Sequence, residues 1–521
     1  MANLSEQFFQ ERKHVLWLGL IAIGLSVGWF FLDGEVKLNL ADEGLLWYGT
    51  QALRLGQLPI RDFQSYDPGR YFWTAAWSFF LGQGVLSLRL SCVLFQSLGV
   101  LAGLLAARRL SRNWLFLICI AILLCAWMHP RYKVFEQSIA LMAVYAGVLL
   151  LERPSVRRHW WLGVFGGLAA FIGCNHGAYH VVAFALLIAW AAREAGWRAW
   201  LRRTLVWDAG LLAGYTPQWL LFIFAPGYFR EFVRYLRSIL SNGTNLVLPV
   251  PWPWLIPGDH PFWLWISGIV EGCFYLALPA FFVFVALRAW QLGRLRKPIH
   301  PVLVATACVS LPYAHYVFSR PDIVHLAHGA PTVVLGLIAL GFTFGKGPRL
   351  GHLLAPLLMV ASLLANLFQF GVTTEVMAPP GSLYSVEVKG QRLLVGLDAA
   401  KVLASAQHLA TDLAQPNEPI LIMPLMPGLY PFIGRLSPTK RTYFVFPSPE
   451  EDRAFLAEIE AAHVEWVMLQ DYPLDARDDL RFMNTNPLVF AHFRKHFARV
   501  PMTTLPEDFV VLRRMRTNPI P

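Results

Sequence analysis

The stretch VLWLGLIAIGLSVGWFFL, residues 15–32, holds no charged side chain over 18 residues and decides the class of fold. A run of this length can cross the hydrocarbon core of a bilayer as a helix. It is too long for the core of a signal peptide, and no small-residue cleavage site follows, so we expect a retained membrane helix. The composition agrees, because 56% of the 521 residues are hydrophobic and only 15% are charged. A polytopic membrane protein is predicted.

Further apolar runs follow the first, and eleven membrane helices are predicted in all. Basic clusters lie in every second connection, and the positive-inside rule assigns these connections and the N-terminus to the cytoplasm. An odd number of spans then puts the C-terminal part of the chain on the outer face. The predicted helices cover residues 15–32, 87–107, 114–128, 135–151, 160–174, 177–192, 205–224, 261–287, 301–318, 324–344 and 351–370.

The segment NLADEGLLWYGTQALRLGQLPIRDFQSYDPGRYFW, residues 39–73, belongs to a long external loop over residues 33–86. Residues 71–84 are apolar, but this stretch is too short to span a bilayer. Counting it as a span would also move the basic cluster at residues 108–112 to the outer side. We therefore expect two interfacial helices in this loop, over residues 43–55 and 70–81.

After about residue 371 charged residues become frequent. Apolar strands are expected at residues 420–423, 443–446, 464–469 and 509–512, between helical stretches such as 399–413 and 449–462. This pattern predicts a soluble α/β domain at residues 371–521, on the outer face, after a membrane domain at residues 1–370. All six cysteines lie in or beside predicted spans, so no disulfide framework is expected in the external domain.

Ionisable side chains gather on the outer face in this topology. A carboxylate there can deprotonate an acceptor hydroxyl, while Arg and Lys bind the phosphate of a leaving group and stabilise its charge. A sugar carried on a lipid phosphate supplies such a leaving group, and this chemistry requires no metal or nucleotide. The residues are Asp42, Glu43, Tyr66, Asp67 and Arg70 in the first loop, Arg131, Lys133 and Glu136 in the second, His176 in the third, Arg230, Arg234 and Arg237 in the fourth, and Arg320, Asp322 and His325 in the fifth.

Other functional classes lack support in the sequence. The net charge of +11 comes mostly from the cytoplasmic clusters, so nucleic-acid binding is not expected. The sequence has no Walker loop, no glycine-rich dinucleotide loop and no set of His and Cys with zinc spacing, which disfavours nucleotide-driven pumps.

Several motifs resemble the GT-C superfamily of membrane glycosyltransferases. The first span followed by ADEG at residues 41–44, GQLP at 56–59 and PGRYFW at 68–73 is similar to the first external loop of that family. The likeness is to bacterial relatives of the protein mannosyltransferases, the lipid A aminoarabinose transferase and the lipopolysaccharide core-sugar transferases. RPDIVHL at residues 320–326 resembles a motif that such proteins carry before a late helix. The resemblance covers nearly the whole chain and includes the external α/β domain.

This resemblance implies roles for individual residues. The acid of the first loop is the catalytic base in the family, which assigns that role to Asp42 with Glu43 beside it. A second external carboxylate corresponds to Glu136, with Asp67 as an alternative. The phosphate-binding Lys of some relatives has no counterpart here, so phosphate binding is left to Arg70, Arg131, Lys133, Arg230, Arg234 or Arg320. The substrate cavity would include Tyr66, Asp67, His176, Asp322 and His325.

Each assignment has a structural alternative. Asp42 can be an N-cap with Glu43 in the first helical turn. The arginines at 230, 234 and 237 can form a basic amphipathic helix on anionic headgroups. Arg320 and its two partners can form an ion pair at a helix end. His176 and His180 are spaced for a metal ion, but no third ligand is obvious, which favours a hydrogen-bonded pair.

The sequence as a whole predicts a glycosyltransferase that moves a hexosyl or pentosyl group from a polyprenyl-phosphate donor to a hydroxyl of a lipid, glycan or protein. Inverting displacement is expected, with Asp42 as the base and with Glu43 and Glu136 positioning substrate or binding a divalent cation if one is used. We expect a multi-pass protein of the bacterial inner membrane, with a cytoplasmic N-terminus and a periplasmic C-terminal domain. The alternative is a secondary transporter or lipid-linked sugar flippase, which Glu271 within a span favours.

Overall fold

The computed structural model describes residues 2–242, 247–344, 348–369, 381–442 and 448–515. The chain forms two compact units. The first, here called the helical unit, contains Met1–Gly34 and Arg89–Met377. The second, the mixed unit, contains Glu35–Leu88 and Ala378–Pro521. The structure therefore groups the first loop with the C-terminal segment, and the predicted domains of residues 1–370 and 371–521 stay a prediction.

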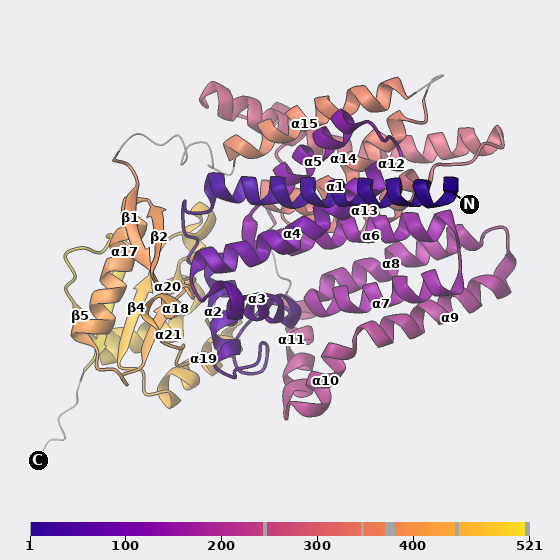
Figure 1. Cartoon of the computed structure of the whole chain (residues 1–521). Helices are drawn as coiled ribbons and strands as arrows, with labels where there is room; N and C mark the ends of the chain where they lie inside the picture. The colour runs from indigo at the N-terminus through magenta and orange to yellow at the C-terminus, as the bar shows by residue number, and fades with distance from the viewer. Residues whose placement is uncertain (1, 243–246, 345–347, 370–380, 443–447, 516–521) are drawn as a thin grey trace, which may run out of the picture. The chain divides into compact units, whose positions relative to one another are not determined.

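Every apolar run that was predicted to span the membrane is helical (Figure 1). Among the described residues, eight helices are long and apolar enough to cross a bilayer. The other apolar helices do not meet the length and composition needed to span, so the count of eleven spans stays a prediction. Pro217 near the start of α10 interrupts the predicted run at residues 205–224. The eight are α1 (Ala2–Asp33), α4 (Val85–Ala107), α6 (Val134–Glu152), α8 (Cys174–Ala192), α12 (Phe262–Arg294), α13 (Pro301–Ser319), α14 (Ile323–Gly341) and α15 (Arg349–Gln369), and the others are α5 (Trp114–Trp127), α7 (Val156–Ile172), α9 (Gly196–Gly214) and α10 (Thr216–Phe224).

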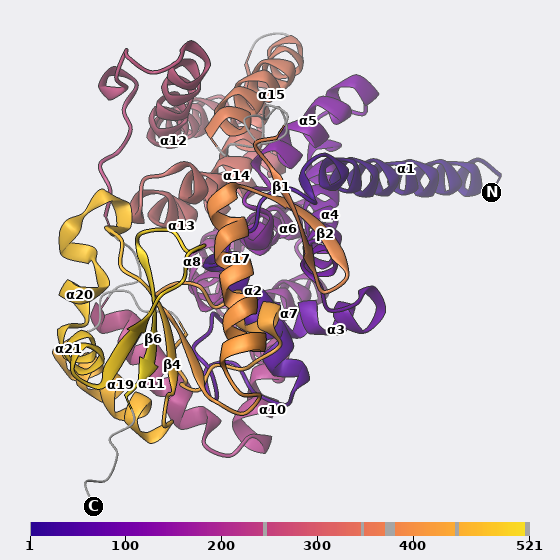
Figure 2. The ribbon, with the colours of Figure 1, turned by 90° about the vertical axis from the view of Figure 1, so that its left-hand side faces the viewer.

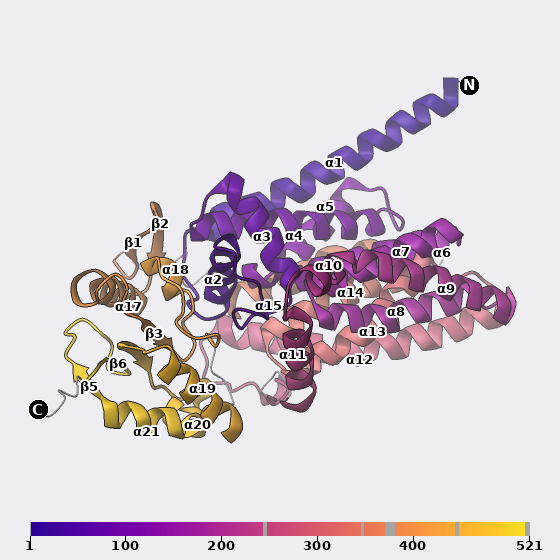
Figure 3. The same cartoon turned by 90° about the horizontal axis from the view of Figure 1, so that it is seen from below.

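Small residues allow close packing within the helical unit. A Cβ atom on Gly163 of α7 would lie 2.1 Å from the carbonyl oxygen of Trp207, and one on Gly210 of α9 would lie 2.3 Å from that of Trp160. Glycine lets these two backbones approach, as is common between membrane helices. Figure 3 shows α8 and α13 running alongside each other, and α13 leads through a short connection into α14. These helices carry the polar groups described below.

The two helices predicted in the first loop are confirmed as α2 (Asp42–Arg54) and α3 (Pro68–Leu81). Both begin slightly earlier than expected, and Pro68 occupies the start of α3, where its missing N–H costs nothing. The basic helix of the fourth loop is α11 (Tyr228–Asn242). The predicted position of α2 and α3 at a membrane surface stays a prediction.

The described residues of the mixed unit form two sheets. β1 (Tyr384–Val388) and β2 (Gln391–Val395) form an antiparallel hairpin. The larger sheet has the order β3-β4-β6-β5, with β3 parallel to β4 and the other pairs antiparallel. In Figure 2, α17 lies on one side of this sheet and α19 and α21 lie on the other. The bounds are β3 (Ile420–Met423), β4 (Trp466–Gln470), β5 (Phe497–Val500), β6 (Phe509–Arg514), α17 (Leu397–His408), α18 (Leu429–Ile433), α19 (Pro449–Ala461), α20 (Phe482–Thr485) and α21 (Pro487–His496).

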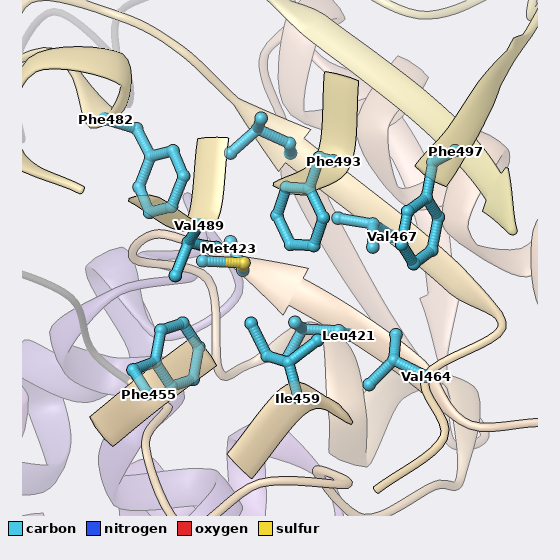
Figure 4. Close-up of a cluster of buried hydrophobic side chains, with 11 residues drawn as sticks. Leu421, Met423, Phe455, Ile459, Val464, Val467, Phe482, Val489, Phe493 and Phe497 are labelled. Atoms are coloured by element: carbon cyan, nitrogen blue, oxygen red, sulfur yellow. The ribbon is translucent and has the colours of Figure 1, made fainter. Parts of the chain in front are cut away.

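Three of the four predicted strands are confirmed as β3, β4 and β6, and the fourth, at residues 443–446, lies outside the described residues. The core of the sheet is a cluster of buried side chains in which Phe455 and Ile459 of α19 face Leu421 and Met423 of β3 (Figure 4). A capping box between Ser448 and Glu451 begins α19 and so places these side chains. The remaining helical elements are short. They are the 3-10 helices η1 (Arg131–Lys133), η2 (Pro253–Leu255), η4 (Leu474–Ala476) and η5 (Asp478–Leu480) and the π-helix η3 (Leu409–Leu413).

Candidate active site

The turn before α2 is held by two side chains other than Asp42. The Asn39 side-chain oxygen accepts hydrogen bonds from the N–H groups of Ala41, at 3.0 Å, and Asp42, at 2.9 Å. The Glu43 carboxylate reaches back to the N–H of Asn39 at 3.3 Å and is only 2% exposed. This reciprocal arrangement resembles a capping box and satisfies N–H groups that a helix start leaves without partners.

Asp42 does not serve as an N-cap. It is the first residue of α2, the N-cap position is taken by Ala41, and no side chain caps the helix from that position. The Asp42 carboxylate is half-buried and accepts a hydrogen bond from the Tyr66 hydroxyl at 3.0 Å. The capping alternative for Asp42 is therefore wrong, because Asn39 and Glu43 perform that role.

Arg70 lies close to the same tyrosine. Its guanidinium carbon is 5.0 Å from the centre of the Tyr66 ring, and the residue is only 5% exposed. The N–H of Tyr66 donates to the hydroxyl of Tyr71 at 3.0 Å, and burial raises the pKa of Tyr71. Asp67 precedes α3 and is buried. The structure thus brings Asp42, Tyr66 and Arg70 together on α2, α3 and the connection between them.

The acidic and basic residues of the second loop lie in the helical unit. Arg131 donates a hydrogen bond to the carbonyl of Asp33 at the end of α1, and its Nη1 atom lies 3.5 Å from the Asp33 carboxylate. The same carboxylate lies 3.7 Å from Nε2 of His129. Lys133 ends the η1 turn, and Glu136 is buried in the first turn of α6. Arg131 therefore has a structural partner in this unit.

The predicted trio Arg320, Asp322 and His325 forms one cluster at the start of α14. The Asp322 carboxylate accepts hydrogen bonds from the backbone N–H of His325 and from Arg320 Nε, at 2.8 and 2.9 Å, and lies 2.8 Å from His325 Nδ1. Asp322 is also the N-cap of α14. Burial favours the neutral carboxyl, but the hydrogen bonds from His325 and Arg320 outweigh it and lower the pKa of Asp322. The helix-end ion pair is confirmed.

Two residues of α12 lie near this cluster. The Tyr275 hydroxyl donates a hydrogen bond to the carbonyl of Asp322 at 2.9 Å. Glu271, one turn earlier on the same helix, is buried and lies within electrostatic range of Asp322. Glu271 is therefore part of the polar group around the start of α14.

The two histidines of α8 have different surroundings. Nδ1 of His176 lies 2.7 Å from the hydroxyl of Tyr313, so this histidine is hydrogen-bonded between helices. His180 is fully buried, stacks on Phe184 and lies beside Phe165. Within the described part of the chain, no three His, Cys, Asp or Glu side chains are grouped so that they could hold a metal ion.

The arginines of α11 are exposed at the surface of the helical unit. Arg230 and Arg234 are 72% and 65% exposed at their side chains. Both approach the carboxylate of Glu231, at 3.4 and 2.8 Å. The Glu231 side chain is 13% exposed, whereas both arginine side chains lie mostly in solvent, so the arginines stay accessible from outside this unit.

Several residues of these clusters were missed by sequence reasoning. Asn39 could have been found, because an Asn four residues before a Glu at a helix start is close to the capping-box pattern. Asp33, Tyr275 and Tyr313 carry no local signal, since each depends on a partner distant in the sequence.

No protein-family model matches the sequence, and no curated protein matches it either. Among solved structures, the chain is similar to ArnT from Cupriavidus metallidurans bound to undecaprenyl phosphate, with a TM-score of 0.52 and 14% identity over 96% of this chain and 98% of that one. ArnT in the apo state gives a TM-score of 0.50 and 14% identity over 98% of each chain. The archaeal oligosaccharyltransferase AglB from Archaeoglobus fulgidus gives 0.47 and 11%, over 98% of this chain and 75% of that one, too low to infer a common fold.

At 14% identity the likeness to ArnT shows the fold. The predicted class, a polytopic helical membrane protein with a C-terminal α/β segment, is therefore confirmed.

Proposed function

We propose that this chain, whose fold is that of the GT-C glycosyltransferases, transfers a sugar from a polyprenyl-phosphate donor to a hydroxyl acceptor. The predicted resemblance to that superfamily is thus confirmed for the fold, and the activity is our proposal. The undecaprenyl phosphate bound by ArnT supports a lipid phosphate as the carrier of the sugar.

One observation carries this proposal. Asp42 lies at the start of a helix but does not cap it, because Asn39 and Glu43 satisfy the N–H groups there. Its carboxylate is oriented instead by the hydroxyl of Tyr66, at 3.0 Å, and stays partly exposed. An oriented and accessible carboxylate is suited to general-base catalysis.

The proposed reaction is a single inverting displacement on the outer face of the membrane. The acceptor oxygen attacks the anomeric carbon while its proton passes to the Asp42 carboxylate. The bond between the anomeric carbon and the phosphate oxygen breaks, and the polyprenyl phosphate leaves with the bonding electrons. Because attack and departure occur on opposite sides of that carbon, the base and the phosphate site must be separated.

Arg70 is our first choice for binding the phosphate. It is buried, its guanidinium carbon lies 5.0 Å from the centre of the Tyr66 ring, and the hydroxyl of that tyrosine contacts Asp42. Arginine binds phosphate oxygens in bidentate fashion and stabilises the leaving group. The alternatives are Arg131, Arg320, Lys133 and the arginines of α11.

The remaining assignments are also proposals. Glu43 holds the turn that carries the base, and Glu136 positions the sugar or the acceptor, a lipid, a glycan or a protein. The reaction needs no cofactor, although a divalent cation is compatible with it. We place the protein in the bacterial inner membrane, with its N-terminus in the cytoplasm and its C-terminal segment in the periplasm.

The test is sugar transfer from a panel of polyprenyl-phosphate sugars by the purified protein in nanodiscs. Wild-type protein should transfer at least one sugar, and Asp42→Asn should bind that donor but not turn it over. Asp62→Asn is the matched control, because Asp62 lies in the same loop and accepts a hydrogen bond from the Leu58 N–H. Equal activity of Asp42→Asn and wild type would remove Asp42 from the mechanism, and uptake into liposomes without any transfer would favour a transporter.

A further inference from the structure

We propose that the turn at residues 426–428 positions Asp42, and that Gly44 and Gly428 are required because their backbones touch. The inference rests on the proposed function in that it takes Asp42 as the base. All the contacts that carry it lie within the mixed unit.

The first contact is between two glycine backbones. The N–H of Gly428 donates to the carbonyl of Leu40 at 3.0 Å. A Cβ atom on Gly44 would lie 2.5 Å from the nitrogen and 2.7 Å from the Cα of Gly428, and one on Gly428 would lie 2.9 Å from the Cα of Gly44. Backbone atoms cannot swing aside as a side chain can, so a methyl group here must move one segment away from the other.

The residues that contact Gly428 lie on both sides of Asp42 in the sequence. Leu40 lies two residues before Asp42, and Gly44 lies two residues after it. Because Asn39 and Glu43 brace the same turn, a displacement at Gly44 should move the Asp42 carboxylate with the turn. The hydroxyl of Tyr66, 3.0 Å from that carboxylate, lies outside the turn and would be left behind.

Both ends of the first loop are attached to strand β2. Leu394 of β2 forms two backbone hydrogen bonds with residues 35–37, at 2.7 and 2.8 Å. Three residues earlier on the strand, the Gln391 side-chain oxygen accepts the N–H of Leu86 at 2.8 Å, and its amide donates to the Ser87 hydroxyl at 3.0 Å. The C-terminal segment therefore closes the loop that carries the acid.

The middle of the loop is attached as well. The N–H of Gln64 donates to the carbonyl of Lys440 at 2.8 Å. The hydroxyl of Tyr48 accepts the N–H of Ser437 at 3.3 Å, and its ring lies 5.5 Å from that of Tyr430. Contacts along the whole loop make the position of Asp42 depend on the C-terminal segment.

Gly428→Ala tests the proposal, with Gly396→Ala as its matched control. Both glycines have backbone angles that alanine adopts without strain, φ −64° and ψ −17° at Gly428 and φ −65° and ψ 161° at Gly396. Nothing lies within 4 Å of a Cβ atom added to Gly396. The two variants therefore differ in the contact with Gly44 and Leu40.

The first readout is hydrogen exchange of the full-length protein in nanodiscs, which needs no substrate. Gly428→Ala should speed exchange of the amides of residues 40–48 by at least about tenfold, and Gly396→Ala should leave it unchanged. The second readout is sugar transfer, in which Gly428→Ala should lower kcat by about 10- to 100-fold with the donor KM within about twofold.

Unchanged exchange in Gly428→Ala overturns the proposal, as does faster exchange with unchanged kcat. If the wild type transfers no sugar from any donor, the proposed function fails, and the predicted effect on kcat fails with it. Hydrogen exchange still decides whether Gly428 holds the turn before α2 in place. Should Gly428→Ala not fold, hydrogen exchange of the wild type in nanodiscs replaces it. The N–H of Gly428, which donates to the carbonyl of Leu40, should then exchange as slowly as the amides of residues 40–48, and rapid exchange of this N–H overturns the proposal.

Discussion

The structure predicts opposite outcomes for two similar changes in adjacent acids. Asp42→Asn and Glu43→Gln each replace a carboxylate by an amide of the same shape. The amide of Asp42→Asn cannot take a proton from the acceptor, so the chemical step should be lost. The amide of Glu43→Gln keeps an oxygen that can accept the Asn39 N–H, so the turn should survive.

The expected losses of kcat in the two variants follow from the contacts of the two side chains. A general base contributes about 10²- to 10⁴-fold, so Asp42→Asn should lower kcat by that factor. In Glu43→Gln a hydrogen bond to a charged acceptor becomes a neutral one, which costs about 1 kcal/mol. That cost corresponds to about a fivefold effect even if all of it appears in the rate. The two variants should therefore differ by at least about 20-fold.

The assay is single-turnover transfer by purified protein in nanodiscs, with donor binding measured separately by equilibrium titration. Both variants should bind donor like the wild type and melt within a few degrees of it, because a loss of about 1 kcal/mol lowers the melting temperature by about 2–4 °C. The reasoning is refuted if Glu43→Gln, folded and binding donor, is as inactive as Asp42→Asn, because Glu43 would then have a chemical role that its hydrogen bond to Asn39 does not explain.

Three further predictions concern the phosphate site, the core and the start of α14. Arg70→Ala should raise the donor KM at least about tenfold, the worth of a charge-assisted hydrogen bond, whereas Arg234→Ala should change it less than about threefold, as measured by initial rates. Phe455→Ala should lower the free energy of unfolding of the mixed unit by about 3–5 kcal/mol in denaturant titrations, whereas Leu397→Ala, exposed at the surface, should change it by less than about 0.5 kcal/mol. The pKa of Asp322 is lowered in the folded state, so its stabilisation of the start of α14 is complete above the ordinary carboxyl pKa of about 4 and is lost as the pH falls through the lower folded value. Exchange of the first-turn amides, corrected for the intrinsic effect of pH, should rise over that range, and Asp322→Asn, which can still cap the helix, should abolish the pH dependence.

The sequence indicated which residues to test as the site but not what each of them contacts. The acid pair after the first span predicted a base, and the resemblance assigned that role to Asp42 with Glu43 beside it. The structure separates them, because Glu43 turns inward to Asn39 while Asp42 meets Tyr66. Which of two adjacent side chains is buried depends on where the helix begins, and a helix start is uncertain by one or two residues in sequence reasoning.

The sequence by itself determined the apolar helices, three strands of the larger sheet and the two helices of the first loop. Each of these elements has a local sequence pattern. An apolar run long enough for a bilayer, or an alternating strand, can be recognised without information on distant residues. Even the glycine and the acid of the ADEG motif are visible there, although the reason for the glycine is not.

Only the tertiary structure decided which segments belong together. It groups residues 35–88 with the C-terminal segment and brings Gly44 into contact with Gly428, although about three quarters of the chain lies between them. Such contacts leave no periodic trace, because backbone hydrogen bonds and the close approach of two glycines involve no side chain whose type would reveal the partner. The position of the proposed base is therefore a property of the fold, whereas its chemistry is a property of the sequence.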